Sequence, residues 1–328
     1  MGRREVIAVE EAAEGTPLDL APAADAQQRV AWWDGDLAYS FRRSPVAVVS
    51  AIVLAICLCA ALFAPWVAPH NPFDLATLNL LDALTPPRGL AGAKAEYLLG
   101  TDDQGRDVLS AIMFGARVSL LVGLAAVVLA MLLGVSMGLM AGYAGGKVDG
   151  FIMRVADVQL SFPAILIALL VDGVARAVLP RDAHGSIALF VLVLAIGVSN
   201  WPQYARTVRG STMVEKSKEY IQAARVIGIR PLGIMMRHLL PNVLGPVLVL
   251  ATINIATAIL TEATLSFLGV GVPPTEPSLG TLIRIGNDFL FSGEWWITIF
   301  PGAALVIMVL AINLLGDWLR DALNPKLR

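Results

Sequence analysis

Five stretches of this chain are each long and apolar enough to cross a lipid bilayer as a helix. A helix needs about 20 consecutive apolar residues to span the hydrocarbon core, and this length is met by residues 45–69, 117–142, 186–205, 242–270 and 295–317. Only 15% of the 328 residues are charged and 57% are hydrophobic, whereas soluble domains carry roughly 25% charged residues. The chain is therefore predicted to be an all-α polytopic membrane protein.

A sixth stretch, residues 151–172, is more polar but keeps one apolar face. It contains Asp157, Gln159, Ser161 and Pro163. Polar groups at membrane depth need partners inside the protein or in water. We therefore expect this stretch to be a spanning helix whose polar stripe faces a bundle interior, which gives six transmembrane helices in all.

The basic residues predict how these spans are oriented. If six spans alternate between two compartments, one side receives five of the 24 Lys and Arg residues before residue 45, two at 147–154, seven at 206–237 and three after 317. That side holds seventeen Lys and Arg residues, and the other side holds seven. Cytoplasmic loops carry the excess of Lys and Arg, so both termini are expected in the cytoplasm of a multi-pass protein of the bacterial inner membrane.

The spans divide the chain into segments with different expected roles. Residues 1–28 are acidic, Ala-rich and almost free of aromatics, a composition typical of disorder; Trp32, Trp33, Tyr39 and Phe41 form either an interfacial segment or a plain aromatic anchor. The expected segments are a partly disordered cytoplasmic tail (1–40), a first transmembrane helix (41–70), a periplasmic loop (71–114), a core transmembrane domain (115–317) with a cytoplasmic loop (206–240), and a cytoplasmic C-terminal tail (318–328).

Motifs for catalysis and for metal binding are missing from the sequence. A phosphate-binding loop requires GxxxxGK followed by Ser or Thr, and the nearest approach, GYAGGK at residues 142–147, has the wrong spacing and is followed by Val148. The two cysteines are two residues apart within the first span, and the three histidines are scattered. We expect no catalytic residue, no metal site and no cofactor on this chain, and nothing indicates nucleic acid binding.

The most informative polar segment is residues 219–242, EYIQAARVIGIRPLGIMMRHLLPN, which lies between apolar stretches. Its composition predicts a short helix outside the bilayer across 211–230, ended by Gly228, and a second short helix opened by Pro231. Ala223 and Ala224 would leave one side small enough for another protein to approach. A loop resting on lipid headgroups explains the same residues equally well on physical grounds.

The spacing of this segment resembles the EAA loop of bacterial ABC importer permeases, which docks on the ATPase. Gln222 stands where that family usually has glutamate, followed by Ala223, Ala224 and Gly228 and later by the Leu240-Pro241 pair. The resemblance implies that the ATPase is contacted by Glu219, Tyr220, Gln222, Ala223, Ala224, Arg225, Gly228, Leu240 and Pro241.

Three further stretches resemble the oligopeptide and dipeptide branch of these importers, and specifically its second (C-type) permease subunit. They are residues 99–123, 261–283 and 312–328, so that the resemblance covers about residues 40–328. It implies a type I ABC importer permease architecture and half of a translocation pathway for peptides. It also implies a homologous permease as heterodimer partner, two ATP-binding subunits that hold ATP and Mg, and a periplasmic or lipid-anchored substrate-binding protein. The spans themselves lie in the lipid bilayer.

Polar residues within the spans are the candidates for lining a pathway, because ionisable groups in membranes are often functional. They are Asp157, Asn200, Asn254, Glu262 and Asn313. Structural roles are the alternative, since asparagines pair between helices and Glu262 lies near a helix end that water reaches. Two rival functions stay open: a proton-coupled secondary transporter with Asp157 and Glu262 as a relay, and the same ABC family carrying glutathione or a nickel chelate.

Overall fold

The computed structural model describes residues 36–74, 78–178, 184–272 and 277–322. In these ranges the chain is helical, apart from turns and one isolated β-bridge between Thr101 and Asp107. The prediction of an all-α protein is therefore confirmed. The chain divides into two units, residues 1–43 and 44–328.

In the first unit, helix α2 (Asp36–Arg43) is described, and within it the Arg43 guanidinium donates to the Tyr39 hydroxyl at 3.1 Å. Most of the predicted disordered tail, together with Trp32 and Trp33, lies outside the described residues, as does the end of the predicted C-terminal tail after residue 322.

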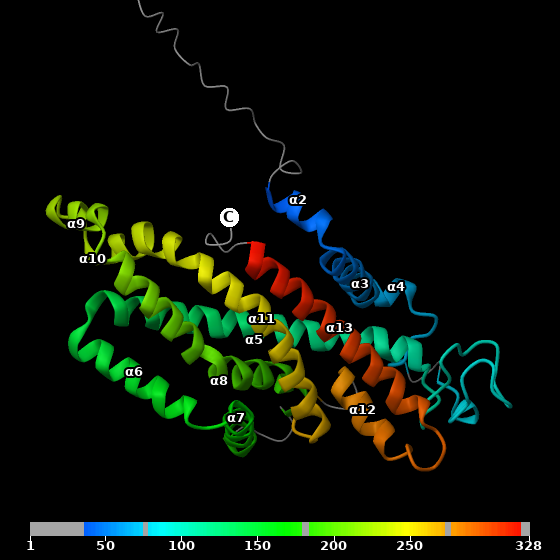
Figure 1. The fold of residues 1–328 in the computed structure, drawn as a ribbon. Coiled ribbons are helices and arrows are strands. Elements are labelled where there is room, and N and C mark those ends of the chain that lie inside the picture. Colours follow the sequence, from blue (N-terminus) through cyan, green and yellow to red (C-terminus); the bar gives the residue numbers. More distant parts are fainter. Residues whose placement is uncertain (1–35, 75–77, 179–183, 273–276, 323–328) are drawn as a thin grey trace, which may run out of the picture. The chain divides into compact units, whose positions relative to one another are not determined.

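Five helical stretches of the second unit are long and apolar enough to cross a membrane, which confirms the five predicted spans. They are Pro45–Leu62, Val108–Ala144, Ile187–Glu215, Pro231–Phe267 and Trp296–Ala322. Figure 1 labels them α3, α5, α8 (His184–Glu215), α10 (Pro231–Gly233) with α11 (Leu240–Phe267), and α13; the π-helical turn η5 (Ile234–Leu239) joins α10 to α11. The shorter helices are α4 (Ala64–Val67), η3 (Leu80–Asp82), α9 (Glu219–Val226) and α12 (Leu279–Asn287).

The spanning helices begin and end at other residues than the apolar runs in the sequence. Helix α3 ends at Leu62, because a new short helix, α4, begins with a proline at its first turn. Helix α5 begins at Val108, inside the expected loop 71–114, because the Asp107 carboxylate caps it by accepting from the Ser110 amide at 2.9 Å. Hydropathy locates the centre of a span, whereas capping residues decide where the helix begins.

The prediction of one continuous helix across 151–172 is wrong. The chain forms α6 (Gly146–Leu160) and α7 (Ala164–Val178), which meet at an angle of 96°. Pro163 lies at the break, where it has no amide hydrogen to donate to the preceding turn and disfavours helical geometry in the residue before it. By length and composition the two helices together count as one broken span, which gives up to six.

A seam of glycines joins α5 closely to α8. Gly134, Gly138 and Gly142 are spaced four residues apart and lie on one face of α5. A Cβ atom built at Gly138 would meet the Ala205 carbonyl oxygen at 2.6 Å, and one built at Gly142 would meet the Thr212 Cβ atom at 2.7 Å. Small residues allow membrane helices to approach this closely, so α5 and α8 form one tightly packed pair.

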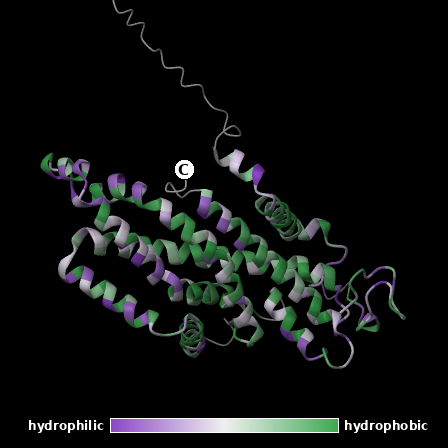
Figure 2. Ribbon diagram, viewed as in Figure 1, coloured by the Kyte–Doolittle hydropathy of each residue, from purple (hydrophilic) through white to green (hydrophobic). Residues whose placement is uncertain are grey.

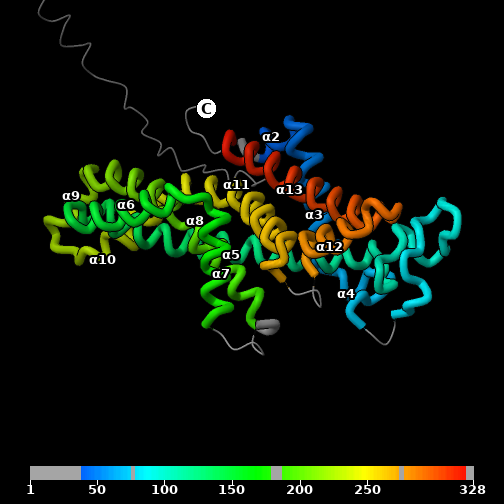
Figure 3. The backbone as a smooth tube through the Cα atoms, turned by 90° about the horizontal axis from the view of Figure 1, so that it is seen from below, coloured from blue at the N-terminus to red at the C-terminus, as the bar shows by residue number. Residues whose placement is uncertain are grey.

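The second unit places its polar segments at two opposite ends of the helices. In Figures 1 and 3, α9 and α10 lie at one end, and residues 78–107 with α12 lie at the other. Figure 2 shows mostly apolar residues along the middle of the helices, with polar residues on α9, in the segment 78–107 and also along α6 and α8. A core of buried apolar side chains from α5, α8 and α11 connects these two ends.

Candidate functional site

The predicted cytoplasmic loop is built as a compact helical turn at one end of the second unit. Helix α8 continues to Glu215, so the expected single helix across 211–230 is wrong: residues 216–218 interrupt it, and α9 begins at Glu219. We call residues 216–242 the coupling segment. Helix α9 lies across its outer side, at the tip seen in Figure 1.

Helix α9 presents one face to its own chain and the other to solvent. Ile221 and Ala224 are buried in the core shared with η5 and α11. Gln222, Ala223 and Arg225 are exposed. The expectation that both alanines leave room for a partner is therefore corrected, because Ala224 packs inward and Ala223 alone leaves a small exposed position on this helix.

Gly228 ends the α9 region as predicted, in a left-handed conformation with φ +87°. The Ile229 amide reaches back to the Ala224 carbonyl at 3.0 Å, and the Gly228 amide to that of Arg225 at 3.0 Å. A Cβ atom at Gly228 would meet nothing within 4 Å. The position therefore needs glycine for its backbone conformation and has open space around it.

Pro231 begins a helix as predicted, but this helix is not a separate short element. Its three residues, α10, run through the π-helical turn η5 directly into α11, so that helical structure continues from Pro231 to Phe267. Pro241 is the second residue of α11, which directly follows the π-helical turn η5. Leu240 is partly buried against the core and Pro241 is exposed.

A polar network fastens α9 to the helices before and after it. The Tyr220 hydroxyl donates to the Glu215 carboxylate at 2.5 Å and accepts from the Asn242 side-chain amide at 3.0 Å. Burial, and then the hydrogen bond to Glu215, raises the pKa of Tyr220 to about 12. Lys218 pairs with the other Glu215 oxygen at 2.8 Å. Tyr220 thus stays protonated and connects the end of α8 to the start of α11.

Gln222, the position that departs from the family pattern, uses its amide within the chain. Its Nε2 atom donates to the Ser217 carbonyl at 3.0 Å. Sequence reasoning missed Glu215 and Asn242 as partners of Tyr220, since they lie five residues before it and 22 residues after it. The three residues lie in three different helices, α8, α9 and α11, so no helical pattern in the sequence could have joined them.

The predicted pathway residues have different surroundings in this chain. Asp157 is half-exposed on α6 and pairs with Arg206 at 2.5 Å, rather than facing the interior of this chain as expected. Asn200 is buried on α8 and donates to the Ile196 carbonyl of its own helix at 2.9 Å. Asn254 is buried on α11, and Asn313 is partly buried on α13.

Glu262 is fully buried, so the expectation that water reaches it is wrong. The Ser119 hydroxyl donates to one carboxylate oxygen and the Ser266 hydroxyl to the other, each at 2.7 Å. These serines in turn accept from the amides of Leu279, at 3.3 Å, and Val272, at 3.4 Å. The carboxylate therefore holds together α5, α11 and the first turn of α12, in surroundings separate from those of Asp157.

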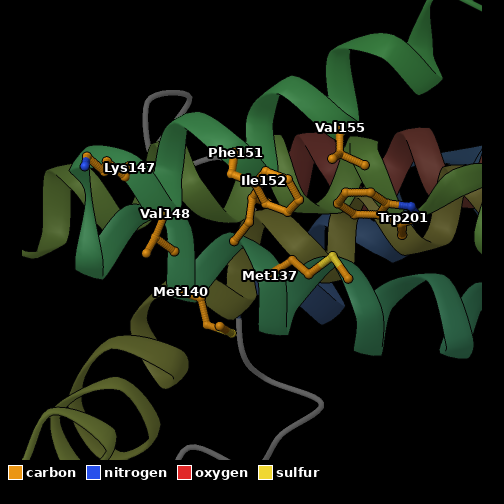
Figure 4. Close-up of a pocket in the computed structure, with 8 residues that line it drawn as sticks. All are labelled: Met137, Met140, Lys147, Val148, Phe151, Ile152, Val155 and Trp201. Carbon is orange, nitrogen blue, oxygen red and sulfur yellow. The ribbon is translucent and has the colours of Figure 1, made fainter.

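An apolar groove of about 530 Å³ lies between α5, α6 and α8 (Figure 4). Its lining is formed by Met137, Met140, Lys147, Val148, Phe151, Ile152, Val155 and Trp201. A peptide carries charged ends and backbone amides, which require polar partners when they leave water. This groove therefore suits apolar packing rather than recognition of a peptide. In the part of the chain that the structure describes, no three His, Cys, Asp or Glu side chains could hold a metal ion.

Known proteins match this chain over most of its length. The family model "binding-protein-dependent transport system inner membrane component" matches residues 130–328, and the model "N-terminal TM domain of oligopeptide transport permease C" matches residues 31–87. The di/tripeptide transport system permease protein of Pseudomonas aeruginosa is 39% identical over 289 residues, which are 88% of this chain and 91% of that protein.

Two other relatives and one solved structure are also similar to this chain. The dipeptide transport system permease protein of Escherichia coli is 43% identical, covering 88% of this chain and 91% of its own length. The oligopeptide transport system permease protein of Bacillus subtilis is 37% identical, covering 90% of each. A chain of the methionine ABC transporter MetNI in an inward-facing conformation has a TM-score of 0.51 and 22% identity, covering 65% of this chain and 96% of that one; at this identity the likeness concerns the fold alone.

Proposed function

The chain belongs to the family of binding-protein-dependent transport system inner membrane components, and from this premise we propose that it is a permease subunit of an ATP-driven importer of dipeptides or oligopeptides. Three relatives that cover about nine-tenths of it are named as permeases for dipeptides, di/tripeptides or oligopeptides. Glutathione and nickel chelates are the alternative cargoes within the same family.

The observation that best supports this proposal is the exposed face of α9. Gln222, Ala223 and Arg225 project from a helix whose other face is buried in its own chain. An ATPase subunit docked on these residues, with Glu219 and Tyr220 beside them, would push on a helix that is fixed to α8 and α11. The left-handed turn at Gly228 and the Leu240-Pro241 pair complete the docking element, and Ala224 anchors it from the inside.

The docking surface has to face the cytoplasm, where ATP is available. The seven basic residues between 206 and 237, and the arginines of α2, favour this side for the coupling segment and for both termini. The substrate-binding protein and the loop 71–114 would then lie on the opposite, periplasmic side. A second, homologous permease would complete the translocation pathway, so that Asp157, Asn200, Asn254, Glu262 and Asn313 act in a heterodimer.

ATP and Mg would be bound and hydrolysed by two partner subunits, and this chain would have no catalytic step of its own. Closure of the partners on ATP would move the two coupling segments and shift the spans from an inward-open to an outward-open arrangement. Such a shift requires that ATP-bound partners contact the two arrangements with different free energy. The exposed face of α9 is where this difference would arise.

Substitution of Ala223 tests the docking directly. Ala223→Arg is expected to abolish copurification of an ATP-hydrolysing subunit with this chain, because a large charged side chain replaces the smallest exposed residue on α9. Asn287→Arg, which places the same side chain on an exposed residue of α12, is expected to copurify normally. Membrane insertion should be unchanged in both variants. Normal copurification and ATPase activity with Ala223→Arg would refute the docking role.

The cargo is tested by the binding protein rather than by this chain. After native purification of the complex with its substrate-binding protein, mass spectrometry is expected to find peptides bound. A nickel chelate, or glutathione alone, would move the proposal to that cargo. A complex that hydrolyses no ATP and carries protons instead would refute it.

A further inference from the structure

Lys216 reaches from the coupling segment to the end of a different span. Its Nζ atom donates to the Tyr143 carbonyl at 2.6 Å and to the Gly142 carbonyl at 3.4 Å. Both carbonyls belong to the last turn of α5, which ends at Ala144. The last carbonyls of a helix have no amide partner within the helix, and a cation there also complements the negative end of the helix dipole.

Two cationic side chains of the coupling segment lie near the aromatic ring of Tyr143. The Lys216 Nζ atom lies 5.7 Å from the centre of its ring, and the Arg225 Cζ atom lies 5.3 Å from it. Both distances are within the range of cation–π attraction. Arg225 belongs to α9, so this one ring joins the docking helix to the end of α5.

The backbones beside these contacts are also close together. At Gly142 a Cβ atom would meet the Thr212 Cβ atom of α8 at 2.7 Å. Arg209, also on α8, forms a two-fold ion pair with Asp149 in the first turn of α6. The ends of α5 and α8 and the start of α6 therefore meet next to the coupling segment.

We propose that Lys216 and Tyr143 are positioning residues that tie the end of α5 to the coupling segment, so that ATP-driven movement of α9 is delivered to α5 as well as to α8 and α11. This inference rests on the proposed function. Helix α5 has 37 residues, and its first turns pack against α12 at Gly115. Displacement at one end of α5 thereby reaches the opposite end of the second unit.

Distances between spin labels test the tether in the intact complex with its ATPase subunits, without knowledge of the cargo. In a background with Cys57→Ala and Cys59→Ala, one label pair is placed at Arg230→Cys and Ala144→Cys, which are exposed positions beside α9 and at the end of α5. A second pair joins Arg230→Cys to Arg320→Cys on α13. Both pairs are measured without nucleotide and with ATP plus vanadate.

In the labelled complex without further substitutions, the first distance is expected to be the same with and without nucleotide to within about 2 Å, the scale of ordinary helix shifts at interfaces. The second distance is expected to change by more. In Lys216→Met the first distance is expected to change with nucleotide. In Tyr143→Leu, which loses the ring but keeps the carbonyl that accepts from Lys216, the distance is expected to change less. Lys216→Arg should restore the constant distance, because it keeps a cationic donor. Lys218→Met is the matched control, since Lys218 pairs with Glu215 and not with α5.

The outcomes separate the tether from the proposed function. If ATP changes neither distance in the unmodified complex, the coupling function itself is wrong. If the second distance changes and the first changes with it, the tether is refuted and coupling remains. A first distance that stays constant in Lys216→Met as well as in Lys218→Met also refutes the tether.

Discussion

Each end of the second unit is stabilised by a different kind of contact. At the α12 end, Glu262 and two serines are buried and hydrogen-bonded to one another, and backbones approach through glycines. At the α9 end, a helix with one exposed face is held by two buried side chains, Ile221 and Ala224, and by single polar side chains such as Tyr220 and Lys216. A buried polar network is rigid when all its groups are paired, whereas a surface helix fixed by few contacts opens at low cost.

Glycine illustrates the same difference. At Gly280 in α12, a Cβ atom would meet the Ala263 Cα atom at 2.5 Å, so glycine is needed for close packing. At Gly228 the space is open and glycine is needed for its positive φ. The α12 end depends on fit between neighbouring helices, and the α9 end depends on the local turn of the chain. Substitutions at the two ends should therefore fail in different ways.

The largest effect is expected from Glu262→Ala. The substitution leaves the hydroxyls of Ser119 and Ser266 without their acceptor and opens a cavity, which should lower the free energy of unfolding by about 3 kcal/mol. Glu262→Gln keeps the shape and one acceptor oxygen and should lose less. The measurement is thermal unfolding of the detergent-purified complex. Equal melting of Glu262→Ala and the unmodified chain would show that the α12 end is not held by this carboxylate.

Gly280→Ala should have the next largest effect, about 2 kcal/mol of lost stability, because its added methyl group meets backbone atoms of α11 that cannot move independently. Gly302→Ala is the matched control on α13, since a Cβ atom there meets nothing within 4 Å. Alanine is the better helix former by about 1 kcal/mol, so the control should melt at the same or a higher temperature. Both are read by the same melting experiment, and a stable Gly280→Ala would refute tight packing at this end.

The sequence predicted the five spans well because a bilayer demands a long apolar run wherever a helix crosses it. The same reasoning failed at residues 151–172, where the average hydropathy suggested a straight helix. Pro163 was visible as a helix breaker, but a proline in a membrane helix is often accommodated by its neighbours. Whether it kinks a helix or breaks it by 96° depends on what α6 and α7 pack against.

In the candidate site, too, features that depend on the local sequence were predicted, whereas contacts between packed helices were not. The turn at Gly228 followed from the sequence, because a left-handed residue is a local requirement. The contacts of Lys216 with Tyr143 and of Glu262 with Ser119 join residues 73 and 143 positions apart. Such contacts exist only after the helices have packed, so the placement of Glu262 was misjudged and Lys216 was overlooked.

At the α9 end, Gly228→Ala should cost about 1 kcal/mol, because a left-handed conformation disfavours any residue with a Cβ atom. The loss should be local: hydrogen exchange in α9 is expected to become faster while the melting temperature of the complex stays the same. Gly210→Ala on α8 is the control, since it is also in open space but has no positive φ. A lower melting temperature in Gly228→Ala alone would erase the contrast between the two ends.

The smallest effect is expected from Tyr220→Phe, which removes the hydroxyl shared by Glu215 and Asn242 and should loosen α9 by about 0.5 kcal/mol. Hydrogen exchange in α9 again measures this. Folding raises the pKa of Tyr220 to about 12, from about 10 in an unfolded chain. A raised pKa gives stabilisation that is complete below pH about 10 and is lost as the pH rises through about 12. The difference between Tyr220→Phe and the unmodified chain should therefore be constant from pH 6 to pH 9, and a difference that varies across this range would mean that another group controls the α9 end.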